Sequence, residues 1–195
     1  SDRMEIRIEQ PCPQCHSEDG LTMLALTTEI PYFGEHTQIT LICDSCGWKH
    51  TDFIPSEGLK PSAWTLALDS EEKLAARVVR SSSCTIRITG LDLEVTPGST
   101  SSGFISNVEG VIKRFEDAIS IVLKGPDGEV NEVRDSANDL LEKLERVKSG
   151  DSTAEIVLLD PRGRSQILHE KAVSRDLTEH ESITLQVGYD WQYLE

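Results

Sequence analysis

The chain has 195 residues, of which 37% are hydrophobic and 27% are charged, so it is expected to form one large or two small globular domains. It has no apolar run of the length that spans a membrane, and its first residues form no signal peptide, so we expect a cytoplasmic protein without a membrane partner. The net charge of −15 argues against nucleic acid, whose phosphates bind Lys and Arg. The charge either keeps the protein in solution or steers a basic protein partner.

Four of the five cysteines lie in two Cys-x-x-Cys pairs. Cys12 and Cys15 form the first pair, Cys43 and Cys46 form the second, and 27 residues (16–42) separate the pairs. Two residues between thiolates let one tight turn direct both sulfurs at the same tetrahedral ion. Gly47 follows the second pair and can adopt the positive φ that such a turn needs. The spacing predicts one structural Zn²⁺ per chain, bound by these four cysteines.

Other readings of the cysteines stay open on spacing alone. They are two disulfides, a redox pair, an iron–sulfur cluster, or a site in which His16 competes as a ligand. Zinc is favoured because two pairs lie within one short hairpin and nothing else indicates secretion. Four thiolates leave no vacant position, so the metal would hold the shape of the site rather than perform chemistry.

The first 60 residues are expected to form this zinc ribbon. Residues 5–9 alternate as a strand does, and residues 21–30 and 38–42 are rich in Thr, Ile and Leu, which indicates the two arms of a hairpin. A turn over residues 31–36 joins the arms. Pro55, Gly58 and Pro61 then mark a boundary, so we expect domains at 1–60 and 61–195.

The second domain reads as mostly β, which makes the fold class α+β. Strands are expected over 63–68, 84–89 and 91–95, with Cys84 as a small buried residue, and residues 70–79 are ambiguous between helix and strand. A loop is expected over 97–103. Residues 155–159 and 164–168 should form a hairpin about Asp160-Pro161-Arg162-Gly163, and residues 183–187 a last strand.

A helical hairpin interrupts this β pattern at 106–149. Ser106 and Glu109 resemble a capping box, after which apolar residues follow helical spacing as far as Val122. Gly125-Pro126 ends the first helix, and a second amphipathic stretch ends at Gly150. A Leu/Val stripe of this kind usually belongs to a core, so we do not interpret it as a partner groove.

The ordered series of motifs resembles the ZPR-one zinc-finger protein family over nearly the whole chain. The motifs are Cys12-Pro-x-Cys15, Ile30-Pro31-Tyr32-Phe33, Cys43-x-x-Cys46-Gly47-Trp48, Cys84-Thr-Ile-Arg-Ile, Ser106-Asn-Val-Glu109-Gly110 and Leu158-Leu159-Asp160-Pro161-x-Gly163. Eukaryotic members carry two such modules and this chain has one, as in the archaeal form. The resemblance implies a zinc ribbon beside a double-stranded β-helix (jelly-roll-like) domain with a helical hairpin. It also implies a protein-interaction module that binds or chaperones translation elongation factor one-alpha.

Two other function classes remain as alternatives: a nucleic-acid-binding zinc ribbon, and a metal-dependent β-barrel enzyme. Barrel enzymes bind their metal through His and carboxylate ligands, but His169 and His180 form no His-x-Asp/Glu pattern and are expected at the surface. No nucleophile motif occurs either. We therefore predict that the chain is not an enzyme.

The expected partner-binding surface is the tip of the cysteine hairpin. Tyr32 and Phe33 are adjacent there, and neighbouring side chains on extended backbone point to opposite sides. A two-stranded ribbon has too little interior for both rings, so at least one is exposed or docks on the second domain. Glu29 and Glu35 flank the rings and would complement a basic partner.

Overall fold

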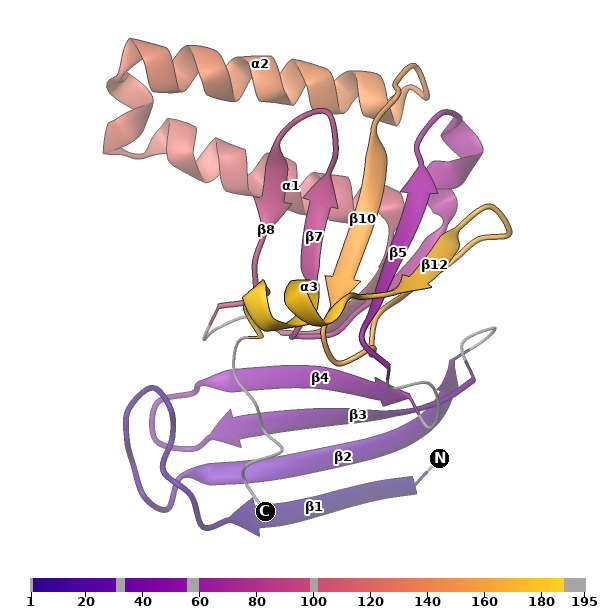
Figure 1. The fold of residues 1–195 in the computed structure, drawn as a ribbon. Coiled ribbons are helices and arrows are strands. Elements are labelled where there is room, and N and C mark those ends of the chain that lie inside the picture. The colour runs from indigo at the N-terminus through magenta and orange to yellow at the C-terminus, as the bar shows by residue number, and fades with distance from the viewer. Residues whose placement is uncertain (1, 31–33, 56–59, 99–101, 188–195) are drawn as a thin grey trace.

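The structure is a computed structural model that describes residues 2–30, 34–55, 60–98 and 102–187. A four-stranded sheet that carries the cysteines lies at one end (Figure 1). A second unit of two further sheets follows it, and a pair of long helices lies at the end of the molecule farthest from the cysteine-bearing sheet. The two further sheets therefore lie between the cysteine-bearing sheet and the helices (Figure 1).

The ribbon sheet is wider than the two arms expected from the sequence. Its antiparallel strands lie in chain order: β1 (Asp2–Ile8), β2 (Leu21–Ile30), β3 (Gly34–Cys43) and β4 (Lys49–Pro55). The two-stranded ribbon was a wrong expectation, because β4 was not predicted although it alternates buried and exposed side chains at its start. Because β4 lies beside β3, the sheet has one edge at β4 and the other at β1.

The second unit is the jelly roll. Its five-stranded sheet has the order β12 (Val173–Asp176), β5 (Ser62–Ala67), β10 (Glu155–Asp160), β7 (Thr85–Ile88) and β8 (Leu93–Val95). Its three-stranded sheet has the order β11 (Gln166–Leu168), β6 (Arg77–Arg80) and β9 (Phe104–Asn107). The ambiguous segment 70–79 divides into both predicted forms, a 3-10 helix η1 (Glu71–Ala75) followed by β6. Strands that neighbour each other in these two sheets are mostly distant in sequence. The expected mostly β fold class is confirmed.

One apolar core joins the jelly-roll sheets to the helices. Leu66, Ile156 and Leu158 of the larger sheet are at most 1% exposed, and Val78 and Ile167 come from the smaller sheet. Cys84 lies in the same core with no exposed surface, as the alternation with Ile86 predicts.

The helical hairpin forms as predicted, but its first cap is one residue later. Helix α1 (Val108–Lys124) joins α2 (Asn131–Lys148) through a 3-10 turn η2 (Pro126–Glu129). The N-cap is Asn107, whose Oδ1 accepts a hydrogen bond from the Gly110 N–H at 2.8 Å. Ser106 is not the cap, because β9 continues through it and ends at Asn107, directly before the helix.

Only the first half of α1 belongs to the core. Val111, Ile112 and Phe115 are buried, whereas Val122 is 45% exposed, because the hairpin extends beyond the sheets (Figure 1). The expectation that the whole stripe lies in a core is wrong for this second half, where a hollow of about 380 Å³ lies between the two helices.

Two expectations for the C-terminal third are wrong. Asp160–Gly163 does form a turn, with the Gly163 N–H donating to the Asp160 carbonyl at 3.1 Å, but β10 and β11 do not pair with each other. The chain crosses there from the larger to the smaller sheet. The segment expected as a strand over 183–187 instead begins within helix α3 (Glu179–Thr184), because Thr178 and Glu181 form a capping box.

Candidate metal centre

The four cysteines lie on two similar turns at the same end of the ribbon sheet. The first turn lies between β1 and β2, and the second lies between β3 and β4. In the first, the His16 N–H donates to the Cys12 carbonyl at 3.0 Å, and in the second, the Gly47 N–H donates to the Cys43 carbonyl at 2.9 Å. His16 and Gly47 both have a positive φ, of 61° and 77°. His16 therefore occupies the position that Gly47 has in the second turn, and the two turns keep the same geometry although one has His and the other Gly there.

The turns bring four sulfurs together at the spacing of a tetrahedral zinc site. The Cys12 and Cys46 Sγ atoms are 3.7 Å apart, as are those of Cys15 and Cys43, and all four lie within 4.8 Å of one another. Zn–S bonds of about 2.3 Å at tetrahedral angles place the sulfurs about 3.8 Å apart. All four cysteines are free, which removes the disulfide alternative. The donor set fits one zinc ion with four thiolate ligands.

Backbone N–H groups prepare these sulfurs to carry negative charge. The N–H groups of Gln14 and Trp48 donate to the Sγ atoms of Cys12 and Cys46 at 3.3 and 3.4 Å. The backbone N–H of Cys46 lowers the pKa of the Cys43 thiol to about 7. The N–H of Trp48 likewise favours the thiolate of Cys46, but burial and the three neighbouring sulfurs raise its pKa to about 12. Four thiolates at this spacing therefore require a cation.

The chain matches two family models, described as the ZPR1 zinc-finger domain, over residues 6–61, and the ZPR1 jelly-roll domain, over residues 72–184. The chain belongs to the ZPR1 (ZPR-one) family. Its cysteines bind one structural zinc ion, and the resemblance drawn from the sequence motifs is confirmed.

Several relatives place the chain within the ZPR1 family. An uncharacterized ZPR1-like protein of Methanocaldococcus jannaschii is 35% identical over 91% of this chain and 88% of its own length, and one of Pyrococcus horikoshii is 34% identical over 94% and 82%. Zinc finger protein ZPR1 of Bos taurus is 32% identical over 87% of this chain, which spans 37% of that protein. A Schizosaccharomyces pombe relative, 29% identical over 82% of this chain and 34% of its own length, is named zinc finger chaperone zpr1.

The predicted partner surface is described only in part. Tyr32 and Phe33 lie outside the described residues. Glu29 and Glu35 lie directly opposite each other where β2 and β3 meet, and both are exposed. The two carboxylates thus face one another across the last described pairs of the hairpin.

A buried polar junction joins the ribbon to the jelly roll. Asp52 of β4 has no exposed surface, and its Oδ2 accepts hydrogen bonds from Ser82 Oγ at 2.7 Å and from the Arg164 guanidinium at 3.4 Å. Its Oδ1 accepts from the backbone N–H groups of Ser82 and Phe53. Asp52 is a ribbon residue, whereas Ser82 and Arg164 belong to the jelly roll, so the carboxylate connects the two units.

A second buried carboxylate continues the junction inside the jelly roll. Asp160 Oδ1 accepts a hydrogen bond from Ser83 Oγ at 2.7 Å, and its Oδ2 accepts from Ser165 Oγ at 2.7 Å and from the Arg164 N–H at 3.0 Å. Gly163 has φ +66° and lies against the backbone of Lys60, where a Cβ would collide. Sequence reasoning missed this role for the Asp160–Gly163 turn.

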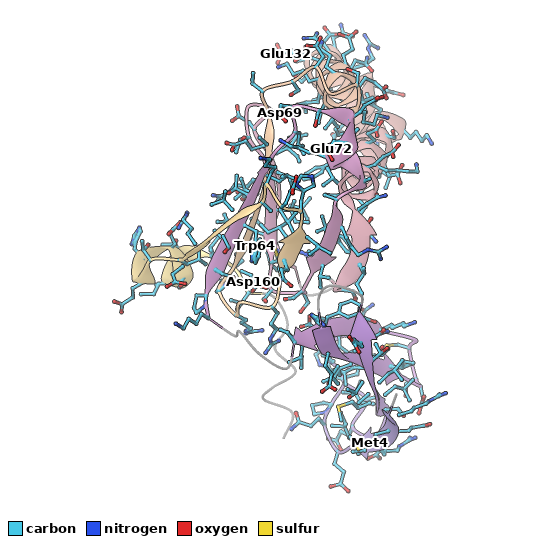
Figure 2. The ribbon with its side chains drawn as sticks, turned by 90° about the vertical axis from the view of Figure 1, so that its right-hand side faces the viewer. Met4, Trp64, Asp69, Glu72, Glu132 and Asp160 are labelled. Atoms are coloured by element: carbon cyan, nitrogen blue, oxygen red, sulfur yellow. The ribbon has the colours of Figure 1, made fainter. Side chains whose placement is uncertain are left out.

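A cavity of about 530 Å³ is lined by residues of both the ribbon and the jelly roll. Figure 2 shows Trp64, one of its lining residues, close to Asp160 near the centre of the molecule. His36 and Asp176 also line the cavity.

Among the described residues, the only group of three or more Cys, His, Asp or Glu side chains placed to bind a metal is the four cysteines. His180 is exposed as expected. The expected surface position is wrong for His169, whose side chain is only 12% exposed and whose Nε2 lies 3.3 Å from Glu72.

The described residues include no helix with the length and apolar character needed to cross a membrane.

Proposed function

We propose that this chain is a zinc-stabilised protein-interaction module that binds and chaperones elongation factor one-alpha. The observation that supports this best is the closed four-thiolate centre in a chain of the ZPR1 family. Such a centre has no position for a substrate, so the metal maintains a surface. The name of the S. pombe relative, zinc finger chaperone zpr1, supports a chaperone function for that surface.

The charge of the chain favours a basic protein surface as its target. The net charge of −15 repels a nucleic acid and attracts a basic partner. Glu29 and Glu35 form a directly opposed pair of like charges, an arrangement that normally destabilises a strand pair. Both carboxylates are exposed, so together they offer a negatively charged surface to Lys or Arg side chains of a partner. We assign the same hairpin tip to Tyr32 and Phe33 as apolar contacts, because aromatic residues dominate binding hot spots.

This function needs no catalytic step, and we propose none. Cysteines stay reduced in the cytosol and can therefore bind zinc there, and a translation factor is found in the same compartment. The chain would therefore act by covering a surface of its partner, and its effect would depend on an intact zinc centre.

The proposal is tested with purified elongation factor one-alpha from the source organism. Charge reversal in Glu29→Lys/Glu35→Lys, and ring removal in Tyr32→Ala/Phe33→Ala, should each weaken binding in calorimetry by more than tenfold, since truncated hot-spot residues commonly cost about 2 kcal/mol or more. Glu170→Lys/Glu179→Lys makes the same charge change at two exposed jelly-roll residues and should bind almost as the unmodified chain does.

The zinc content and melting temperature of each variant distinguish binding from folding. A large fall in melting temperature for Tyr32→Ala/Phe33→Ala would mean that the rings dock on this chain. Unchanged binding by both tip variants would remove the tip from the interface. No binding of the factor by the unmodified chain would overturn the proposed partner.

A further inference from the structure

Strand β1 is an edge of the ribbon sheet. It pairs with β2 along residues 2–8, and no other described strand lies on its second side. Met4 and Ile6 are 50% and 42% exposed, which are large exposed fractions for apolar residues of a strand. Figure 2 places Met4 at the end of the molecule opposite Glu132 of the helical hairpin, away from the jelly roll. The edge is accessible and apolar on one face.

The sequence of β1 is complementary to itself when reversed. About Ile6, Glu5 mirrors Arg7, Arg3 mirrors Glu9, and Met4 mirrors Ile8. In an antiparallel pair, residues directly opposite each other lie on the same face and interact most strongly. Two β1 strands centred on Ile6 would therefore place Glu5 opposite Arg7 and each apolar residue opposite another apolar residue. Pairing continued one residue beyond β1 would add Arg3 opposite Glu9.

Neighbouring registers lack this property. A pair centred on Glu5 would place Glu5 against Glu5 and Arg3 against Arg7 of the other strand, so like charges would oppose one another at these positions. A pair centred on Met4 would retain one kind of ion pair, between Arg3 and Glu5, but would leave Ile6 opposite Asp2. Alternating charges usually protect an edge strand from pairing. Here they favour the Ile6-centred register over these neighbours.

We propose that two copies of this chain associate through β1, antiparallel, about a twofold axis that passes perpendicular to the sheet at Ile6. The occupant of the edge is thus a second copy, and the two ribbon sheets become one continuous sheet. Met4 and Ile6 are covered by Ile8 and Ile6 of the other copy. Such an interface is isologous, as in most soluble homodimers.

Two features of the chain could oppose this association. The net charge of −15 repels a second copy at long range. At about 0.15 M salt the Debye length is about 8 Å, so this repulsion is largely screened, whereas ion pairs in direct contact are screened less. Arg7 already donates to Asp44 at 3.1 Å and to the Asp19 carbonyl at 2.7 Å. A guanidinium has five N–H donors, so these contacts leave Arg7 able to donate to Glu5 of a second copy.

The pairing leaves the rest of the molecule accessible. The hairpin tip with Glu29 and Glu35 lies on β2 and β3. Strand β2 lies between β1 and β3, so the free edge of β1 faces away from β3. The inference therefore does not depend on the proposed partner.

Sedimentation velocity of the full zinc-loaded chain tests the proposal over a range of concentrations at physiological salt. The unmodified chain should show a concentration-dependent monomer–dimer equilibrium. Glu5→Arg should weaken it by at least about tenfold, because the new side chain would face Arg7 of the other copy twice per dimer. Arg7→Glu should weaken it similarly. Glu170→Arg makes the same change as Glu5→Arg at an exposed jelly-roll position and should leave the equilibrium unchanged.

Restoring the charge pattern gives the decisive result. The double swap Glu5→Arg/Arg7→Glu should recover the dimer, and an equimolar mixture of the two single variants should form a mixed dimer. Both outcomes require residue 5 to face residue 7 of a second copy. A chain that stays monomeric up to about 1 mM, where even weak complexes form, would overturn the proposal. So would a dimer that none of these substitutions alters.

Discussion

The ribbon and the jelly roll are held together by different means. Among the residues that the structure describes, the ribbon's buried apolar cluster has five members, and two of them, Cys12 and Cys43, are zinc ligands. The jelly-roll core has 18 described buried members, drawn from both sheets, η1 and the helical hairpin. Small domains with little apolar burial commonly need a metal or disulfides. Zinc therefore replaces a core in the ribbon, whereas the jelly roll has a core of its own.

The junction between the two regions follows neither pattern. It is built from buried carboxylates, serines and Arg164, with the Asp52 and Arg164 side chains 0% and 2% exposed. Each buried charge is partnered, which is the condition under which such groups are tolerated. Because Asp52 is on β4, loss of the ribbon fold would also deprive the jelly roll of this carboxylate.

The largest expected effect is on the ribbon. Cys43→Ser removes one of four thiolates, and structural zinc in finger peptides contributes about 10–16 kcal/mol, so zinc should be lost and the ribbon should unfold. Elemental analysis of the purified variant checks this. Cys84→Ala is the matched control, because this cysteine lies in the jelly-roll core and not at the metal. Full zinc content in Cys43→Ser would contradict the ligand assignment.

The next effect breaks the junction. Asp52→Asn removes the charge opposite buried Arg164, and loss of one partner of a buried ion pair costs about 3–5 kcal/mol. Chemical denaturation should show a loss of this size with zinc still bound. Glu94→Gln, which removes one partner of the exposed Arg87–Glu94 pair, should cost less than about 1 kcal/mol. Equal effects of the two variants would show that the junction is not structural.

A smaller or equal effect probes the jelly-roll core. Leu158→Ala removes a side chain with no exposed surface and should destabilise the protein by about 2–5 kcal/mol. The difference from Cys43→Ser lies in the metal, because Leu158→Ala should keep one zinc per chain. If Leu158→Ala released zinc, the two regions would share a single core, and the comparison would be wrong.

The smallest effect is a difference between the two regions in their response to low pH. The Arg175 guanidinium lowers the pKa of Glu181 from 4.5 to about 2. A depressed carboxyl pKa contributes stability above the unfolded value of 4.5 and loses it as the pH falls toward about 2. The pair should thus persist at pH 3–4, where protonated cysteines already release zinc. An NMR titration of Glu181 checks this, and Arg175→Gln should return its pKa toward 4.5. An unaltered titration in that variant would exclude Arg175 as the cause.

Local sequence predicted the parts of the fold that depend on local geometry. The cysteine spacing and Gly47 predict the metal site because a Cys-x-x-Cys turn is complete within a few residues. The helical hairpin is predicted because apolar periodicity and stop residues lie within the helices themselves. Both Ser106 and Asn107 have side chains that can cap a helix, and the cap is Asn107 because β9 continues through Ser106 and ends only at Asn107.

The missed features depend on residues that are distant in sequence. Asp52 and Arg164 lie 112 positions apart, and polar residues of this kind are mostly exposed, so nothing local marked them as a buried junction. Alternation at Ile183, Leu185 and Val187 suggested a strand, yet Ile183 is 74% exposed. The signal that could have corrected this was Thr178-Glu179-His180-Glu181, a capping box that precedes the segment.

The most direct test of the central claim is hydrogen exchange, followed amide by amide, with and without a zinc chelator. We predict that chelation removes protection from the paired amides of β2 and β3, while β7 and β10 keep most of theirs because their core has no metal. Re-addition of zinc should restore the ribbon amides. Protection of β2 and β3 that survives complete zinc removal would contradict the claim that the metal holds the ribbon.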